Sequence, residues 1–113
     1  MKTLCLAPNE TYKAAEILSS GGIVAIPTET VYGLAADAFN TEAIKKIFIA
    51  KGRPSDNPLI VHISEIDEIY NLVSELPEKA QILAKKFWPG PLTMILPKKS
   101  SVSDYITAGM PSV

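Results

Sequence analysis

The arginine and the histidine of this chain are each present once, and both lie in the stretch that runs from Lys51 to His62. Lys51 and Arg53 lie two residues apart around a glycine, so their cations can converge on a polyphosphate. Arginine supplies a planar, bidentate fork and lysine a movable point charge. Asn57 adds an amide that can donate and accept hydrogen bonds. The spacing alone favours a structural alternative, because cations and a Gly-x-Pro sequence are common at helix C-termini.

A second polar group, Thr28 and Thr30, follows an apolar run that predicts a strand. Ligands of open α/β sheets bind outside the carboxyl ends of strands. The two hydroxyls could hold a small polar substrate or a phosphate. The equally weighted alternative is a turn with local threonine hydrogen bonds.

His62 lies inside an apolar run and could point into a site at the end of the sheet. The alternative is a half-buried histidine with a satisfied hydrogen bond. No second histidine accompanies it, so a zinc site is not expected. No cysteine or serine signature suggests a nucleophile, and the common glycine-rich phosphate motifs are absent. The lone Cys5 excludes an internal disulfide.

Composition predicts a single globular domain. The chain has 113 residues, a formal charge of −1 and 47% hydrophobic residues. A near-zero charge argues against a general nucleic-acid binder. No apolar run approaches the length of a membrane helix, and no secretory leader is recognised. A cytoplasmic location is therefore expected.

The elements that must position these residues alternate between helices and strands, which predicts an α/β fold with a twisted open sheet and flanking helices. Apolar runs predict core strands at 23–26, 59–63 and 92–96, and an edge strand at 4–6. Four helices are predicted: one capped by Asn9 and ended by Gly21–Gly22, one capped by Asn40 or Thr41 and ended at 51–54, one over 65–73 and one from Pro77 to Phe87.

Three local details accompany these elements. The second helix should bury one face, formed by Ala43, Ile44, Ile47 and Phe48. Ser64 and Asp67 predict a capping box. The loop 97–101 and the pairs Lys85–Lys86 and Lys98–Lys99 should be solvated. The last residues, 108–113, enter apolar sequence and predict the start of a strand. We therefore expect the chain to be part of a longer one.

Three segments together carry a family resemblance. Residues 21–34 (GGIVAIPTETVYGL), 51–63 (KGRPSDNPLIVHI) and 88–93 (WPGPLT) resemble, in this order, the signatures of the YrdC-like domain family. The resemblance covers nearly the whole chain. It implies a YrdC-like α/β fold around a large cavity, with residues 1–113 as the N-terminal part of one such domain.

The resemblance also implies an activity, since the best-known members of the family are threonylcarbamoyl-AMP synthases. They join L-threonine, bicarbonate and ATP, with Mg²⁺ accompanying ATP, and release pyrophosphate. A partner tRNA threonylcarbamoyl transferase complex then modifies tRNA. The residues implied are Thr30 and His62 for L-threonine, and Lys51, Arg53, Asn57 and Ser112 for ATP. No nucleophile and no metal ligand from the protein is implied.

The family's later Ser-x-Asn motif has no counterpart in these 113 residues, so the chain alone is expected to have little activity. An RNA-binding module is the alternative function, which a steep salt dependence of binding would reveal. A domain of a carbamoyltransferase that matures hydrogenases ranks last, because the expected cysteine elements are missing.

Overall fold

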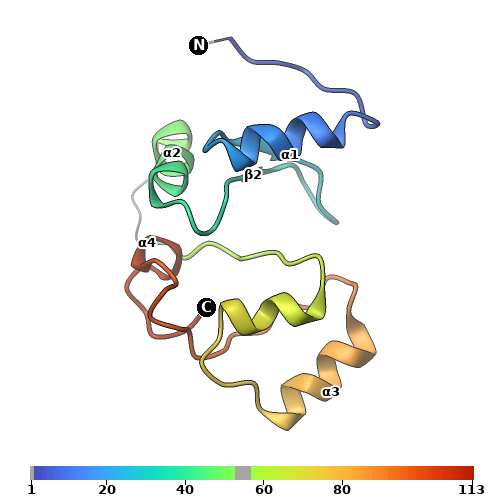
Figure 1. Cartoon of the computed structure of the whole chain (residues 1–113), viewed down its shortest axis with the longest axis vertical. Coiled ribbons are helices and arrows are strands. Elements are labelled where there is room, and N and C mark those ends of the chain that lie inside the picture. The colour runs from blue at the N-terminus through green and yellow to red at the C-terminus, as the bar shows by residue number, and fades with distance from the viewer. Residues whose placement is uncertain (1, 53–56) are drawn as a thin grey trace. The chain divides into compact units, whose positions relative to one another are not determined.

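The computed structural model describes residues 2–52 and 57–113. The chain forms two compact units, Met1–Arg53 and Pro54–Val113, and each is described by itself (Figure 1). The first unit contains α1 (Thr11–Ser19), β1 (Val24–Ile26), β2 (Gly33–Ala35) and α2 (Thr41–Lys51). The second contains the 3-10 helix η1 (Ile66–Asn71), α3 (Glu78–Phe87) and α4 (Asp104–Thr107).

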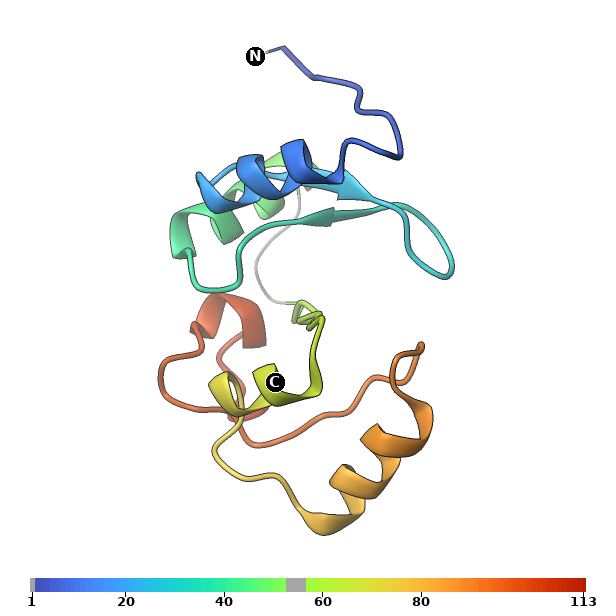
Figure 2. The ribbon, with the colours of Figure 1, turned by 45° about the vertical axis from the view of Figure 1, so that its right-hand side comes forward.

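The first unit is built around an antiparallel hairpin. Val24 pairs with Ala35 and Ile26 pairs with Gly33, so β1 and β2 flank a loop at residues 27–32. Figure 2 shows α1 alongside this hairpin and the loop projecting beyond it. The polar segment that follows the first predicted strand is therefore the tip of a hairpin.

Helix α1 begins after Glu10, whose side chain makes no capping hydrogen bond. The predicted cap Asn9 is wrong, because Glu10 is the N-cap residue. Its carboxylate accepts hydrogen bonds from Lys13 Nζ at 2.6 Å and from the Ala7 N–H at 2.7 Å. The hydrogen bond from Lys13, and to a smaller extent the one from the Ala7 N–H, lowers the pKa of the Glu10 carboxyl.

The predicted glycine end of α1 is confirmed. Gly21 has a φ of 89°, and its N–H donates to the Leu18 carbonyl at 3.1 Å. The N–H of Gly22 donates to the Ile17 carbonyl at 2.8 Å. This pair of bonds is the Schellman arrangement, which needs the left-handed backbone that glycine adopts without strain.

Helix α2 agrees closely with its prediction. The Asn40 side chain accepts a hydrogen bond from the Ala43 N–H at 3.1 Å. Gly52 ends the helix with a φ of 62°. The buried residues are the four predicted ones, Ala43, Ile44, Ile47 and Phe48. The 3.6-residue period of the apolar positions was sufficient to identify this face.

The second unit is organised by the segment 96–99, which pairs on both sides. On one side, the Ser74 N–H donates to the Pro97 carbonyl at 3.0 Å and the Lys99 N–H donates to the Leu72 carbonyl at 2.8 Å. On the other side, Leu96 and Val113 exchange two hydrogen bonds of 2.9 Å. The core around this segment consists of Ile69, Leu72, Val73, Ala80, Ala84, Val102 and Ile106.

Two predicted core strands of this unit are wrong. Residues 59–63 and 92–96 belong to no named helix or strand among the described residues. Ile60 and Ile95 are 64% and 79% exposed, whereas their sequence neighbours are partly buried. A continuous apolar run predicts burial on both faces, and here one face of each segment is open.

Other expectations are corrected as well. Residues 4–6 form no strand. The predicted capping box of Ser64 and Asp67 is wrong, because Glu68 accepts from Ser64 Oγ at 2.5 Å and from the Glu65 N–H at 3.1 Å. The element that follows is a 3-10 helix, and the short α4 was not predicted. Its four residues are too few for a periodic pattern to identify.

The Asn40 cap gives a direct test. We expect Asn40→Ala to lower the free energy of unfolding by about 1 kcal/mol, because the Ala43 N–H loses its acceptor. Urea unfolding followed by circular dichroism would measure the change. Asn9→Ala is the matched control, since Asn9 caps no helix, and equal losses in both variants would contradict the assignment.

Thr107 gives a second test. It is 1% exposed, and its hydroxyl has no hydrogen-bond partner among the described residues. Thr107→Val keeps the shape and removes the buried hydroxyl, so we expect a gain in unfolding free energy of about 1 kcal/mol. Thr107→Ser keeps the hydroxyl and removes a buried methyl, so it should lose stability. A valine variant less stable than the parent chain would show that the hydroxyl is satisfied.

Candidate functional site

The hairpin tip of the first unit holds the two candidate threonines. The Thr28 hydroxyl accepts a hydrogen bond from the Thr30 N–H at 3.2 Å, and it donates to the Val31 carbonyl. The two hydroxyl oxygens lie 3.4 Å apart. Both threonines are exposed. The predicted alternative, a turn with local threonine hydrogen bonds, is therefore confirmed as a structural description, and ligand binding there stays a prediction.

The C-terminal end of α2 holds Lys51, whose side chain is exposed. The helix-end interpretation is confirmed, because Lys51 lies in the last turn directly before the left-handed Gly52. Arg53 lies outside the described residues, so its convergence with Lys51 on a phosphate stays a prediction. A cation in the last turn also stabilises the helix through its dipole.

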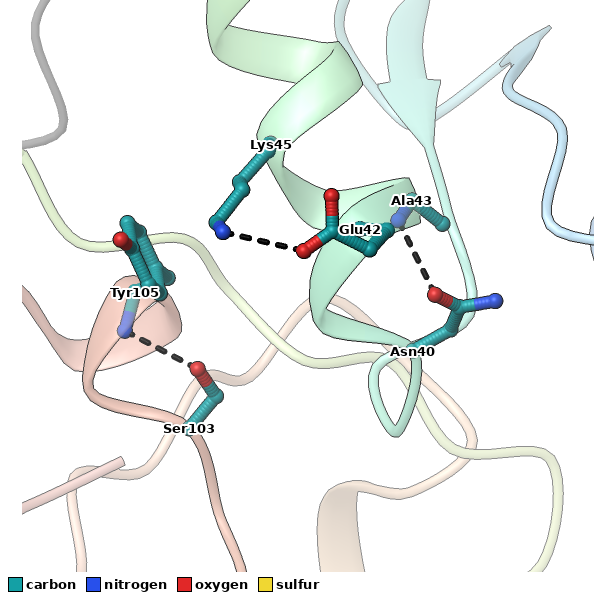
Figure 3. Close-up of polar contacts among 6 residues, drawn as sticks. All are labelled: Asn40, Glu42, Ala43, Lys45, Ser103 and Tyr105. Carbon is teal, nitrogen blue, oxygen red and sulfur yellow. Dashed lines mark hydrogen bonds and ion pairs between the residues drawn. The ribbon is translucent and has the colours of Figure 1, made fainter.

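The other polar contacts of α2 hold the helix in place. Lys46 Nζ donates to the Gly21 carbonyl at 2.7 Å, which ties the middle of α2 to the end of α1. Glu42 and Lys45 form an ion pair at 3.0 Å near the Asn40 cap (Figure 3). The Lys46 contact and the Asn40 cap stabilise helix α2, and Lys51 lies in the last turn of this helix.

In the second unit, Asn57 and His62 are both exposed. The Leu59 N–H donates to the Ile106 carbonyl at 2.8 Å, which anchors their segment to α4. His62 Nδ1 lies 3.3 Å from the Ile60 carbonyl oxygen. The half-buried interpretation of His62 is wrong in its burial, because the residue is exposed, although the ring keeps a local contact with the Ile60 carbonyl.

Ser112 is partly buried and pairs with Pro97 in an isolated antiparallel bridge. The Lys98 N–H donates to the Pro111 carbonyl at 3.0 Å, on the same side of the 96–99 segment. The predicted start of a strand at the end of the chain is not observed, because Ser112 forms only an isolated bridge. Its partner is the segment that the sequence had marked as a solvated loop.

Lys98 corrects that expectation further, because its side chain is only 13% exposed. Nζ donates to the Val102 carbonyl at 2.8 Å and lies 3.2 Å from Asp104 Oδ1. The lysine thus fixes the loop that leads into α4, where Ser103 Oγ accepts from the Tyr105 N–H (Figure 3). No spacing signal in the sequence distinguishes Lys98 from the exposed Lys85, Lys86 and Lys99.

The predicted site residues therefore fall into two sets. Thr30 and Lys51 belong to the first unit, and Asn57, His62 and Ser112 belong to the second. Thr30 lies in the loop of the hairpin and Lys51 in the last turn of α2, whereas Asn57, His62 and Ser112 lie outside the named helices and strands. Of the predicted residues that the structure describes, Thr30, Lys51, Asn57 and His62 expose their side chains, as binding requires.

This mixed helix-and-strand domain has clear relatives. The Sua5/YciO/YrdC family model, described as "Telomere recombination", matches residues 16–113. The chain belongs to this family. It is 57% identical over 102 residues to the threonylcarbamoyl-AMP synthase of Bacillus subtilis, covering 89% of this chain and 30% of that protein. It is 54% identical over 100 residues to the threonylcarbamoyl-AMP synthase of Pyrococcus abyssi, covering 88% of this chain and 29% of the relative.

A solved structure agrees with the fold. The crystal structure of P. abyssi Sua5 complexed with L-threonine matches with a TM-score of 0.89 and 49% identity, over 97% of this chain and 32% of that one. The predicted YrdC-like α/β class is thereby confirmed. The chain spans about 30% of the length of these curated relatives.

The described residues contain neither a helix that could span a membrane nor a cluster of metal ligands. Between residues 2–52 and 57–113, no helix is both long and apolar enough to cross a membrane. Within the same part of the chain, no three histidine, cysteine, aspartate or glutamate side chains gather into a metal-binding group.

The contacts of Lys98 predict an unequal response of two neighbouring lysines. Lys98→Met removes the charged donor and leaves the Val102 carbonyl and Asp104 without it, so we expect a loss of about 1–2 kcal/mol in unfolding free energy. Lys99→Met, at an exposed position, should change it by less than about 0.5 kcal/mol. Urea unfolding of both variants checks this, and equal stabilities would contradict the anchoring role.

Proposed function

We propose that this chain belongs to an enzyme that makes threonylcarbamoyl-AMP from L-threonine, bicarbonate and ATP. The observation that carries the proposal is the identity of 54–57% to threonylcarbamoyl-AMP synthases over nearly nine-tenths of the chain. The structure of a relative complexed with L-threonine supports the amino acid as a substrate.

The proposal assigns roles to the predicted residues. Thr30 and His62 hold L-threonine. Lys51 and Arg53 neutralise the phosphates of ATP, and Asn57 and Ser112 contact the nucleotide. The exposure of Lys51, Asn57 and His62 supports these roles. The half-burial of Ser112 suits a contact through its hydroxyl or backbone at the rim of a site.

The proposed chemistry needs no protein nucleophile. The amine of threonine and bicarbonate form a carbamate with loss of water. A carbamate oxygen then forms a bond to the α-phosphorus, while the bond from that phosphorus to the bridging oxygen breaks and pyrophosphate leaves with the electron pair. The residues contribute positioning and neutralisation of charge, and a water-excluding site protects the carbamate and the adenylate.

We propose that Mg²⁺ accompanies ATP and is held mainly by its phosphates. Magnesium is usually bound through one or two carboxylates and substrate phosphates, with waters completing its shell. When bound it would neutralise phosphate charge. We place the activity in the cytoplasm and the product with a tRNA threonylcarbamoyl transferase complex.

The enzyme assay is pyrophosphate release that requires ATP, L-threonine and bicarbonate together. The product, threonylcarbamoyl-AMP, should be identified by mass spectrometry. Because the chain spans about 30% of its relatives' length, the assay should compare the chain alone with a longer form that extends it to the relatives' length. Failure of the longer form to release pyrophosphate would contradict the proposal.

Two variants separate the two substrates. We expect Arg53→Lys to weaken ATP binding by roughly tenfold or more, because the lost bidentate hydrogen bonds contribute about 1.5–3 kcal/mol. His62→Ala should weaken L-threonine binding more than ATP binding. Isothermal titration calorimetry measures both affinities, with Lys85→Ala as the control at an exposed helical position. Equal effects of His62→Ala on both ligands would remove its assignment to the amino acid.

A further inference from the structure

Lys98 places a charged group where water has little access, since its side chain is only 13% exposed. A charge in such a place is costly unless polar partners compensate it. Nζ has two partners, the Val102 carbonyl at 2.8 Å and Asp104 Oδ1 at 3.2 Å. The Asp104 side chain is 76% exposed, so water screens that pair. Val102 is 2% exposed, so the hydrogen bond to its carbonyl is the stronger restraint.

This restraint acts on α4, a helix that is too short to set its own position. The helix has four residues, and isolated helices of this length are not stable in water. Its position therefore depends on contacts with the rest of the second unit. These contacts are the burial of Ile106 and Thr107, at 2% and 1% exposure, and the bond from Lys98 to the loop directly before the helix.

Helix α4 in turn holds the segment that carries two candidate site residues. The Leu59 N–H donates to the Ile106 carbonyl at 2.8 Å. Leu59 lies between Asn57, which the proposed function assigns to the nucleotide, and His62, which it assigns to L-threonine. Both of these side chains are exposed, so their own packing does little to position them, and the backbone of the segment must do so.

The backbone of Lys98 acts on a third candidate, Ser112. The Lys98 N–H donates to the Pro111 carbonyl at 3.0 Å, and Pro97 forms the antiparallel bridge with Ser112. One residue therefore holds the loop before α4 through its side chain and the residue before Ser112 through its backbone.

We infer that Lys98 is a positioning residue of the proposed site, which holds α4 and thereby sets the position of the segment 57–62 without contacting either substrate. This inference deepens the proposed function and rests on it for the identity of the ligands. It predicts a result that the loss of a direct contact would not give. Because one segment carries a residue for each substrate, a shift of the segment weakens both ligands together.

Isothermal titration calorimetry of the longer form measures this parallel loss, at a temperature where every variant is folded. We expect Lys98→Met, which removes the donor and keeps an unbranched side chain, to weaken ATP and L-threonine by similar factors, roughly two- to tenfold each. Unchanged affinities would overturn the inference. A loss for one ligand alone would also overturn it, since it would indicate a direct contact.

Two control variants separate position from charge and from stability. Lys99→Met removes the same charge at the exposed neighbouring residue. Asn40→Ala lowers stability in the first unit through the loss of a helix cap. We expect both controls to keep both affinities within about twofold of the parent protein. Losses in either control as large as those of Lys98→Met would contradict the positioning role.

Amide hydrogen exchange, followed by NMR in the 113-residue chain, tests the positioning step without a ligand. We expect Lys98→Met to speed the exchange of the Leu59 N–H by roughly fivefold or more. The Ile44 N–H in α2, which donates to the Asn40 carbonyl at 3.0 Å, should keep its rate. An unchanged Leu59 rate, or equal acceleration of both amides, would show that Lys98 does not position the segment. If the parent longer form binds neither ATP nor L-threonine, the proposed function fails, and the exchange result alone decides the role of Lys98.

Discussion

Backbone amides and carbonyls that leave a helix or strand must find new partners, and this requirement shapes both units of the chain. The end of α1 meets it through the Gly21 turn, the hairpin tip through the Thr28 hydroxyl, and the second unit through the 96–99 segment. Two of the candidate site residues, Thr30 and Ser112, lie directly beside one of these features. Their positions follow from how the neighbouring backbone is satisfied more than from the packing of their own side chains.

The sequence predicted most of what depends on local chemistry. The Asn40 cap, the buried face of α2 and the glycine ends of both helices of the first unit arise from interactions within about five residues. Asn9 is not the cap, because the helix begins one residue later: Glu10 occupies the N-cap position and makes no side-chain capping hydrogen bond. Two adjacent residues able to cap are not distinguished by propensity alone.

What the sequence could not predict depends on contacts between distant segments. The burial of Lys98 results from the pairing of 96–99 with 72–74 and 111–113, none of which has a local signal. Likewise, the runs 59–63 and 92–96 are as apolar as core strands, but their alternate residues are exposed. Apolar composition indicates that a segment can be buried. Which neighbours bury it depends on the tertiary structure. The candidate site residues were predicted through motif resemblance, because their individual types left the functional and structural interpretations open.

Under the proposed function, the candidate residues of the first unit separate by charge, which bears on how L-threonine and ATP are distinguished. L-Threonine carries an ammonium and a carboxylate, and ATP carries only negative charge near its reacting phosphorus. Under the proposed function, the Glu29 carboxylate at the hairpin tip would favour the ammonium of L-threonine, whereas Lys51 in the last turn of α2 would favour a phosphate. A threonine hydroxyl free to rotate would serve either role equally. Either hydroxyl of the Thr28–Thr30 pair could donate to the other, so under the proposed function the fixed charges of Glu29 and Lys51, and not the hydroxyls, separate an ammonium from a phosphate.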